Sequence, residues 1–349
     1  MARIKWLNLR FLITFGVFLI ILLILILHAT KLIQVRHREK CPYVYRIDEP
    51  TRSLRLLSPN RSETIHMCVV AGMEGIETEV EVFLKSVVLK SHLYSIDIHF
   101  LCGDGSRPRV EKILPRKHHP FINIKYDLRN LNKQDVMREL DKIHVIINKP
   151  GDIYKFAKAF LHLLFPDIDK CIVLDTDLIF GTDPAYLWNE FKNQHDLEII
   201  TMKVNQDMPN QDYANSGVML LNMKRMREIQ FQNNYIPAAK EYCSQFIDQG
   251  REYYTCNVGD QNLFYGVFRN RSHLFSSLPP SWTLEFCYDF LGFTFDRYYS
   301  TTNNMFFGIA HLNCLNFISH RENGAFLDFV EGKGYNKILI KYIKAVMNI

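Results

Sequence analysis

Residues 170–180 read KCIVLDTDLIF, and this stretch decides the fold. Four apolar residues lie directly before Asp175, and three more directly follow Asp177. A short, continuous apolar run that contains β-branched residues is typical of a strand buried on both faces. Two carboxylates separated by one residue point to the same side of an extended chain. The stretch therefore predicts a buried strand that carries Asp175 and Asp177 at its end.

Segments of strand and helix character alternate on both sides of this stretch. Apolar runs predict further strands at residues 65–72, 96–105, 122–128, 197–204 and 216–223. Helical spacing predicts helices at 77–91, 107–116 and 154–165, the last one stopped by Pro166. This alternation favours an α/β fold with a mostly parallel sheet, in which ligands bind beyond the carboxyl ends of the strands.

The N-terminal region predicts a membrane anchor. Phe11 to Leu27 is a run of 17 uncharged residues, and at about 1.5 Å per residue it approaches the ~30 Å hydrocarbon thickness. No good cleavage motif follows it, which favours an uncleaved signal anchor over a cleaved signal peptide. We therefore expect a cytoplasmic tail (1–10), a transmembrane anchor (11–28), a stem (29–64) and one lumenal domain (65–349). This is the organisation of a single-pass type II protein of the endoplasmic reticulum or Golgi membrane.

Composition excludes other classes of protein. Of the 349 residues, 48% are hydrophobic and 23% are charged, which excludes a disordered chain. The net charge is only +5, and seven basic residues lie between Arg3 and Lys40 against one acid, Glu39. The rest of the chain is close to neutral, so nothing indicates the concentrated basic face that nucleic-acid binding requires.

The eight cysteines and two glycosylation sequons agree with a lumenal domain. No C-x-x-C pair occurs, so disulfides are favoured over zinc ligation. Buried free thiols are the alternative for Cys68, Cys102 and Cys171, which lie in apolar runs. The sequons begin at Asn60 and Asn270.

Asp175 and Asp177 are candidate metal ligands. Carboxylate oxygens at a strand end suit magnesium or manganese bound together with substrate phosphates. The alternative is an ordinary acidic loop, because two aspartates at this spacing are frequent by chance.

Four motifs follow one another in an order that resembles glycosyltransferase family 8, the retaining enzymes that use nucleotide sugars on a GT-A fold. These motifs are FPDIDKCIVLDTDLIF (165–180), NSGVMLLNMKRMR (215–227), VGDQNLF (258–264) and GIAHLN (308–313). The resemblance covers residues 65–316 and is greatest to secretory-pathway enzymes of the xyloside xylosyltransferase type. It departs from the family pattern after His311, where a glycine and a Lys-Pro-Trp sequence are missing and His320 or Arg321 would have to replace the basic group.

The resemblance implies a fold and a function. The fold would be the Rossmann-like mixed sheet of GT-A enzymes, flanked by helices and preceded by one transmembrane helix. The function would be metal-dependent, retaining transfer of a sugar, above all xylose from UDP-xylose, onto a glycan acceptor on a glycoprotein. Manganese would be the metal, with magnesium possible. The alternatives are a UDP-glucose or UDP-galactose donor, or a catalytically inactive lectin-like or scaffold relative.

The resemblance also implies roles for individual residues. The metal ligands would be Asp175, Asp177 and His311. The donor contacts would come from Val70, Ala71, Gly72, Lys158, Thr176, Ser216, Gly217 and Asn313, in addition to the two aspartates. The residues at the reacting centre would be Asn215, Asp260 and Gln261.

Several of these residues also have a purely structural interpretation. His311 would be a packed core histidine, Lys158 a solvated lysine with Lys155 as its rival, and Asp260 a helix N-cap. Val70 and Ala71 would be buried strand residues, and the Asn215–Gly217 segment would be a turn.

Overall fold

The computed structural model describes residues 63–72, 76–92, 94–103, 105–114, 124–142, 152–205, 213–239, 260–279, 282–285, 308–312, 342 and 345–346. All of them belong to the compact unit Pro59–Ile349. The predicted tail (1–10), anchor (11–28) and nearly all of the predicted stem lie outside the described residues. None of the described helices is long and apolar enough to cross a membrane.

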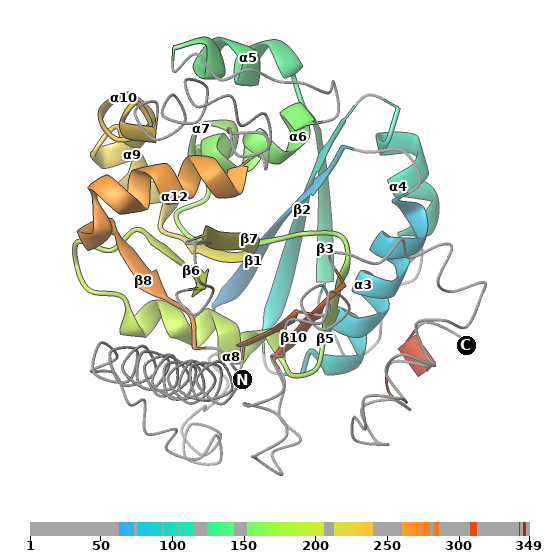
Figure 1. Cartoon of the computed structure of the whole chain (residues 1–349). Helices are drawn as coiled ribbons and strands as arrows, with labels where there is room; N and C mark the ends of the chain where they lie inside the picture. Colours follow the sequence, from blue (N-terminus) through green and yellow to red (C-terminus); the bar gives the residue numbers. More distant parts are fainter. Residues whose placement is uncertain are drawn as a thin grey trace, which may run out of the picture. The chain divides into compact units, whose positions relative to one another are not determined.

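A seven-stranded mixed sheet forms the centre of the fold (Figure 1). Its strands, in spatial order, are β3 (Ile124–Asn130), β2 (Ser95–Cys102), β1 (Thr64–Ala71), β4 (Cys171–Leu174), β7 (Tyr213–Leu221), β6 (Ile200–Asn205) and β8 (Phe275–Ser277). The four strands from β3 to β4 are parallel, whereas β7 is antiparallel to both β4 and β6. The mixed α/β sheet expected from the sequence is confirmed.

Helices and 3₁₀ turns connect these strands. They are α3 (Glu77–Lys90), α4 (Arg107–Ile113), α5 (Lys133–Asp141), α6 (Asp152–Phe156), η1 (Ala157–Phe160), α7 (Leu161–Leu164), α8 (Pro184–Asn189), η2 (Glu190–Asn193), α9 (Met223–Glu228), α10 (Phe231–Asn234), α12 (Asp260–Asn270) and η4 (Ser272–Leu274).

Alternate side chains of the central strands build two cores. Met67 and Val69 of β1 pack in the same core as Phe83 of α3, whereas Cys68 packs in the other with Phe264 of α12. Figure 1 shows α3 and α4 on one side of β2 and β3, and α9 and α12 on the other. Each such fully buried apolar side chain stabilises the fold by about 1.5–3 kcal/mol. The layers therefore follow from the period-2 alternation of the strands.

Cys68, Cys102 and Cys171 are buried free thiols, as the second of the two interpretations predicted. Residues 243, 256, 287 and 314, the other cysteines of the domain, lie outside the described residues. Asn270, at the start of the second sequon, is exposed at the end of α12.

The stretch 170–180 does not form one strand, which corrects the prediction. It forms β4 in the large sheet and β5 (Leu178–Phe180) in a second, three-stranded sheet with β10 (Ile309–His311) and β9 (Thr283–Glu285). One residue beyond the last register pair of β4 with β7, the Asp175 amide donates a hydrogen bond to the Gly217 carbonyl at 3.0 Å. The chain then bends, and the Asp177 carbonyl accepts a hydrogen bond from Leu312, just after β10, at 3.0 Å. Residues 175–177 are therefore the bend between two sheets.

The predicted helix 154–165 is also interrupted. Its middle, Ala157–Phe160, is a 3₁₀ turn between the short helices α6 and α7, and it contains Lys158. A 3₁₀ turn winds more tightly than an α-helix and so changes the direction in which its side chains point. The segment ends before Pro166, as predicted.

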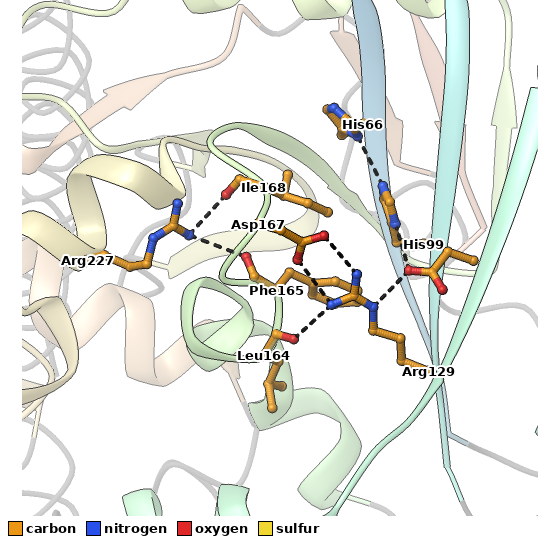
Figure 2. A network of polar contacts seen from close by, with 9 residues as sticks. His66, His99, Arg129, Leu164, Phe165, Asp167, Ile168 and Arg227 are labelled. Atoms are coloured by element: carbon orange, nitrogen blue, oxygen red, sulfur yellow. Dashed lines mark hydrogen bonds and ion pairs between the residues drawn. The ribbon is translucent and has the colours of Figure 1, made fainter.

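Two arginines hold the loop that enters β4 (Figure 2). Arg129 of β3 binds the Asp167 carboxylate through two nitrogens, at 3.1 and 3.2 Å, and its guanidinium lies 4.5 Å from the centre of the Phe165 ring. Arg227 of α9 donates to the carbonyl of Ile168 at 3.0 Å. The residues that they contact lie shortly before β4 in the sequence, so the two arginines fix the position from which β4 begins.

His162 of α7 is a buried histidine on the same segment. Its side chain is fully buried, and its Nε2 lies 3.1 Å from the amide oxygen of Gln232. Burial lowers the pKa of His162 to about 4. The imidazole is therefore neutral in the folded protein at neutral pH.

We expect His162 to make the protein sensitive to acid. Because its pKa is lower in the folded state than in the unfolded state, the stability it contributes is lost as pH falls from about 6.5 toward 4. Between pH 7 and pH 5 the loss is about 2 kcal/mol of unfolding free energy. In urea unfolding at both pH values, His162→Asn should lose less stability than the unsubstituted protein, while His273→Asn, at an exposed position in η4, should lose as much. Equal losses in all three proteins would contradict the assignment.

Candidate active site

The predicted site residues meet where β4 ends. Asp175 and Asp177 lie in the bend after β4, and Asn215 to Gly217 lie beside them on the antiparallel strand β7. His311, the last residue of β10, pairs in register with Leu178 of β5. The topology thus brings together three motifs that lie far apart in the sequence.

Asp175, Asp177 and His311 form a cluster that fits a divalent metal. One ligand atom from each of the three lies within 4.8 Å of the other two. The Nε2 of His311 lies 3.4 Å from Oδ1 of Asp177 and 3.6 Å from Oδ2 of Asp175. This nitrogen is buried and makes no hydrogen bond of good geometry within the described part of the chain. Two carboxylate oxygens and one imidazole nitrogen are a ligand set that manganese and magnesium accept.

Lys158 is buried among acidic groups, so it is not the solvated lysine of the structural interpretation. Its Nζ lies 2.5 Å from Oδ1 of Asp175 and 3.2 Å from Oδ2 of Asp260. It also donates a hydrogen bond to the Ser216 carbonyl at 3.2 Å. Asp175 therefore presents one oxygen to Lys158 and the other to His311. The rival Lys155 lies on α6 and is exposed.

The buried charges shift one another's pKa. Burial disfavours the ionised form of Asp175, but Lys158, together with His311, holds the pKa of this carboxyl well below its usual range. Burial also opposes the charge of His311, yet the carboxylates of Asp177 and Asp175 raise the pKa of His311 to about 10. The pKa of Lys158 is likewise raised, because Asp175 and Asp260 outweigh the burial of its ammonium group. In Asp260, burial prevails over Lys158 and raises the pKa. The metal-free site is thus a closely packed set of opposite charges.

Gly217 and Asn215 shape the wall beside His311. A Cβ on Gly217 would collide with the imidazole ring of His311, so only glycine permits this approach. The side-chain oxygen of Asn215 accepts a hydrogen bond from the Gly217 amide at 2.8 Å, and its nitrogen lies 3.5 Å from Nδ1 of His311. Asn215 therefore touches the candidate ligand His311 on the side away from the carboxylates.

The end of β1 is packed against an aromatic ring. The space that a Cβ on Gly72 would occupy is filled by the Tyr154 ring, which also fills the corresponding space at Gly103. Ala71 is buried and Val70 is half-buried. The packing of Tyr154 explains the glycine at position 72, and the contact of residues 70–72 with a nucleotide base stays a prediction.

The structure adds Glu79, which the sequence analysis missed. The Thr176 hydroxyl, expected on the donor side, donates to the Glu79 carboxylate at 2.6 Å. Burial, aided by the charges of Asp177 and Asp175, raises the pKa of Glu79 to about 7 against the opposing hydrogen bond from Thr176. One signal was present in the sequence. Glu79 lies in the first turn of the helix after β1, and that turn lies at the same edge of the sheet as Asp175.

Some of the remaining predicted site residues lie at the start of α12 or on β7, and others lie outside the described residues. Asp260 is the first residue of α12, and Gln261 follows it with a partly exposed side chain. Ser216 is buried. Asn313, His320 and Arg321 lie outside the described residues.

Comparison with known proteins identifies relatives over most of the chain. The family model described as "Glycosyl transferase family 8" matches residues 78–301. Glucoside xylosyltransferase 2 of Mus musculus is 26% identical over 253 residues, which cover 66% of this chain and 54% of the relative. This chain therefore spans about half the length of that curated relative.

Two solved structures share the fold. The apo form of mouse xyloside xylosyltransferase 1 has a TM-score of 0.56 at 20% identity, over 72% of this chain and 98% of that chain. The galactosyltransferase LgtC, solved with donor and acceptor sugar analogues, has a TM-score of 0.52 at 20% identity, over 78% of this chain and 96% of that chain. These likenesses confirm the GT-A-type α/β fold.

We expect removal of the Lys158 charge to destabilise the protein. Lys158→Met removes the ammonium group shared by the half-buried Asp175 and the buried Asp260, which costs about 3–5 kcal/mol of unfolding free energy. Adding Asp260→Asn removes the buried charge that is left without a cation and should recover about 1–2 kcal/mol. Urea unfolding of the single and double variants measures both values. A double variant no more stable than Lys158→Met would contradict the pairing of Lys158 with Asp260.

Proposed function

The chain belongs to glycosyl transferase family 8, and we propose that it is a metal-dependent, retaining xylosyltransferase that moves xylose from UDP-xylose onto a glycan acceptor on a glycoprotein. The observation that carries this proposal is the cluster of Asp175, Asp177 and His311 at the end of β4, with a buried imidazole nitrogen that makes no hydrogen bond of good geometry among the described residues. A catalytically inactive relative would not need to keep all three ligand atoms within 4.8 Å of one another.

The proposed cofactor is manganese, with magnesium as the alternative. Asp175, Asp177 and His311 would hold it, and when bound it would neutralise negative charge that develops on the leaving diphosphate. Asp175 would keep its other oxygen on Lys158, which holds this carboxylate ionised and ready to bind a cation.

Three side chains of this site would act on the donor sugar or position the groups that do. Gln261 is partly exposed on α12. Its amide is not a strong nucleophile, so we assign it the role of orienting sugar or acceptor hydroxyls by hydrogen bonds. Asp260 is buried against Lys158, and we assign it the role of positioning that lysine. Asn215 would orient His311 from its Nδ1 side. Because Gln261 offers only an amide and the Asp260 carboxylate is paired with Lys158, we propose retention without a covalent intermediate.

Xylose as the donor sugar is supported by the similarity to glucoside xylosyltransferase 2 of Mus musculus. UDP-galactose and UDP-glucose are the alternative donors. Both solved structures are only 20% identical to this chain, which is too distant to carry a donor preference across.

We also propose, from the sequence alone, that residues 11–28 anchor the domain in the membrane of the endoplasmic reticulum or Golgi as a type II protein. The uncharged run from Phe11 to Leu27 supports this proposal.

A donor screen tests the proposed activity. The purified protein is incubated with manganese and UDP-xylose, UDP-glucose or UDP-galactose, and release of UDP is measured. We expect the fastest release from UDP-xylose and its loss when the metal is chelated. Because Asp177→Ala removes a metal ligand, it should lower the rate by about a thousandfold. The exposed Asp196, in the turn before β6, supplies the control variant Asp196→Ala, which should keep the full rate.

Two outcomes would overturn the proposal. Full activity in Asp177→Ala would exclude the metal site. A product whose anomeric configuration is inverted relative to the donor would exclude a retaining transferase.

A further inference from the structure

Glu79 contacts the middle residue of the bend that carries two candidate metal ligands. Its carboxylate accepts the 2.6 Å hydrogen bond from Thr176, the residue between Asp175 and Asp177. On the other side of the bend, the Asp177 carbonyl is held by the Leu312 amide after β10. Helix α3 and strand β10 therefore hold the same short segment from two directions.

Glu79 differs from the neighbouring glutamates of α3 in its ion-pair partners. Glu77 pairs with Arg109 at 3.5 Å, and Glu81 pairs with Lys85 at 2.7 Å. Within the part of the chain that the structure describes, no basic side chain forms an ion pair with Glu79. Glu79 is half-buried, and the charges of Asp177 and Asp175 act on it. An acidic group without a basic partner among the described residues, next to the bend that carries two further carboxylates, favours a cation nearby.

We propose that Glu79 is a positioning residue for the metal site: it fixes the Asp175–Asp177 bend through the Thr176 hydroxyl, and its negative charge strengthens binding of the cation. This inference rests on the proposed metal-dependent function and adds a residue to it. Groups that hydrogen-bond around metal ligands orient those ligands, and their loss typically weakens metal binding 10–100-fold.

The two roles of Glu79 can be separated by substitution. Thr176→Val removes the hydroxyl but keeps the size of the side chain and every charge. Thr176→Ser keeps the hydroxyl and should restore binding. Glu79→Gln keeps an oxygen that can accept the hydrogen bond but removes the charge. Glu81→Gln, which breaks a partly exposed ion pair on the same helix, is the matched control.

Manganese binding to the metal-free full-length protein is the first measurement, made by titration calorimetry without nucleotide. We expect Thr176→Val and Glu79→Gln to bind manganese about tenfold more weakly, and Thr176→Ser and Glu81→Gln to bind within about twofold of the unsubstituted protein. Thermal melting of each variant shows whether it is folded, and the two conservative variants, Thr176→Ser and Glu79→Gln, keep the test decisive if Thr176→Val is unstable.

Binding of uridine diphosphate without metal is the second measurement, and it separates charge from structure. Removal of a negative charge lowers repulsion of the diphosphate, so Glu79→Gln should bind metal-free nucleotide several-fold more tightly. Thr176→Val should not gain affinity. Damage to the fold would weaken the binding of both manganese and nucleotide. This proposal instead requires that Glu79→Gln bind manganese more weakly and metal-free nucleotide more tightly.

The outcomes distinguish this inference from the proposed function. If the unsubstituted protein binds no manganese, the metal-dependent function fails and the role of Glu79 fails with it. If it binds manganese and both Thr176→Val and Glu79→Gln bind equally well, only the role of Glu79 is overturned. Weakened manganese binding with stronger metal-free nucleotide binding in Glu79→Gln supports the proposal.

Discussion

Lys158 carries a positive charge in the protein interior, and much of the site follows from the need to neutralise it. A buried ammonium group costs several kcal/mol unless acidic groups surround it closely. Asp175 and Asp260 satisfy it from different elements, the end of β4 and the start of α12. Their meeting on one nitrogen ties α12 to the sheet. It also divides the two oxygens of Asp175, so that one serves Lys158 and the other faces His311.

The sequence predicted most of the framework and the candidate metal ligands. The run Cys171–Leu174, which forms β4, is visible in the sequence because a strand buried on both faces is apolar along its length. Asp175 and Asp177 stood out because two carboxylates directly follow such a run. His311 has no comparable local signal, and only the order of the four motifs indicated it. Its position beside both aspartates agrees with that prediction.

The features that the sequence did not reveal depend on contacts between distant residues. Nothing within residues 170–180 shows that β4 and β5 join different sheets, because the partners that separate them, β7 and β10, lie elsewhere. The 3₁₀ turn at Lys158 interrupts a segment whose apolar spacing suits a continuous helix. The charges that draw Lys158 inward come from β4 and α12. Glu79 was missed because an acid in the first turn of a helix is already explained by the helix dipole.

The pairing of β10 with β5 determines when, during synthesis of the chain, the candidate metal site can form. The large sheet, Lys158 and both of its acidic partners are encoded before β8 ends, whereas His311 belongs to the last described strand. A chain still emerging from the ribosome can assemble most of its core from residues already synthesised, because domains fold as their segments become available. It cannot complete the candidate metal site until residues 309–311 have been added and have paired with β5. Competence to bind the cation would then report that synthesis and folding of the domain have progressed through its final described strand.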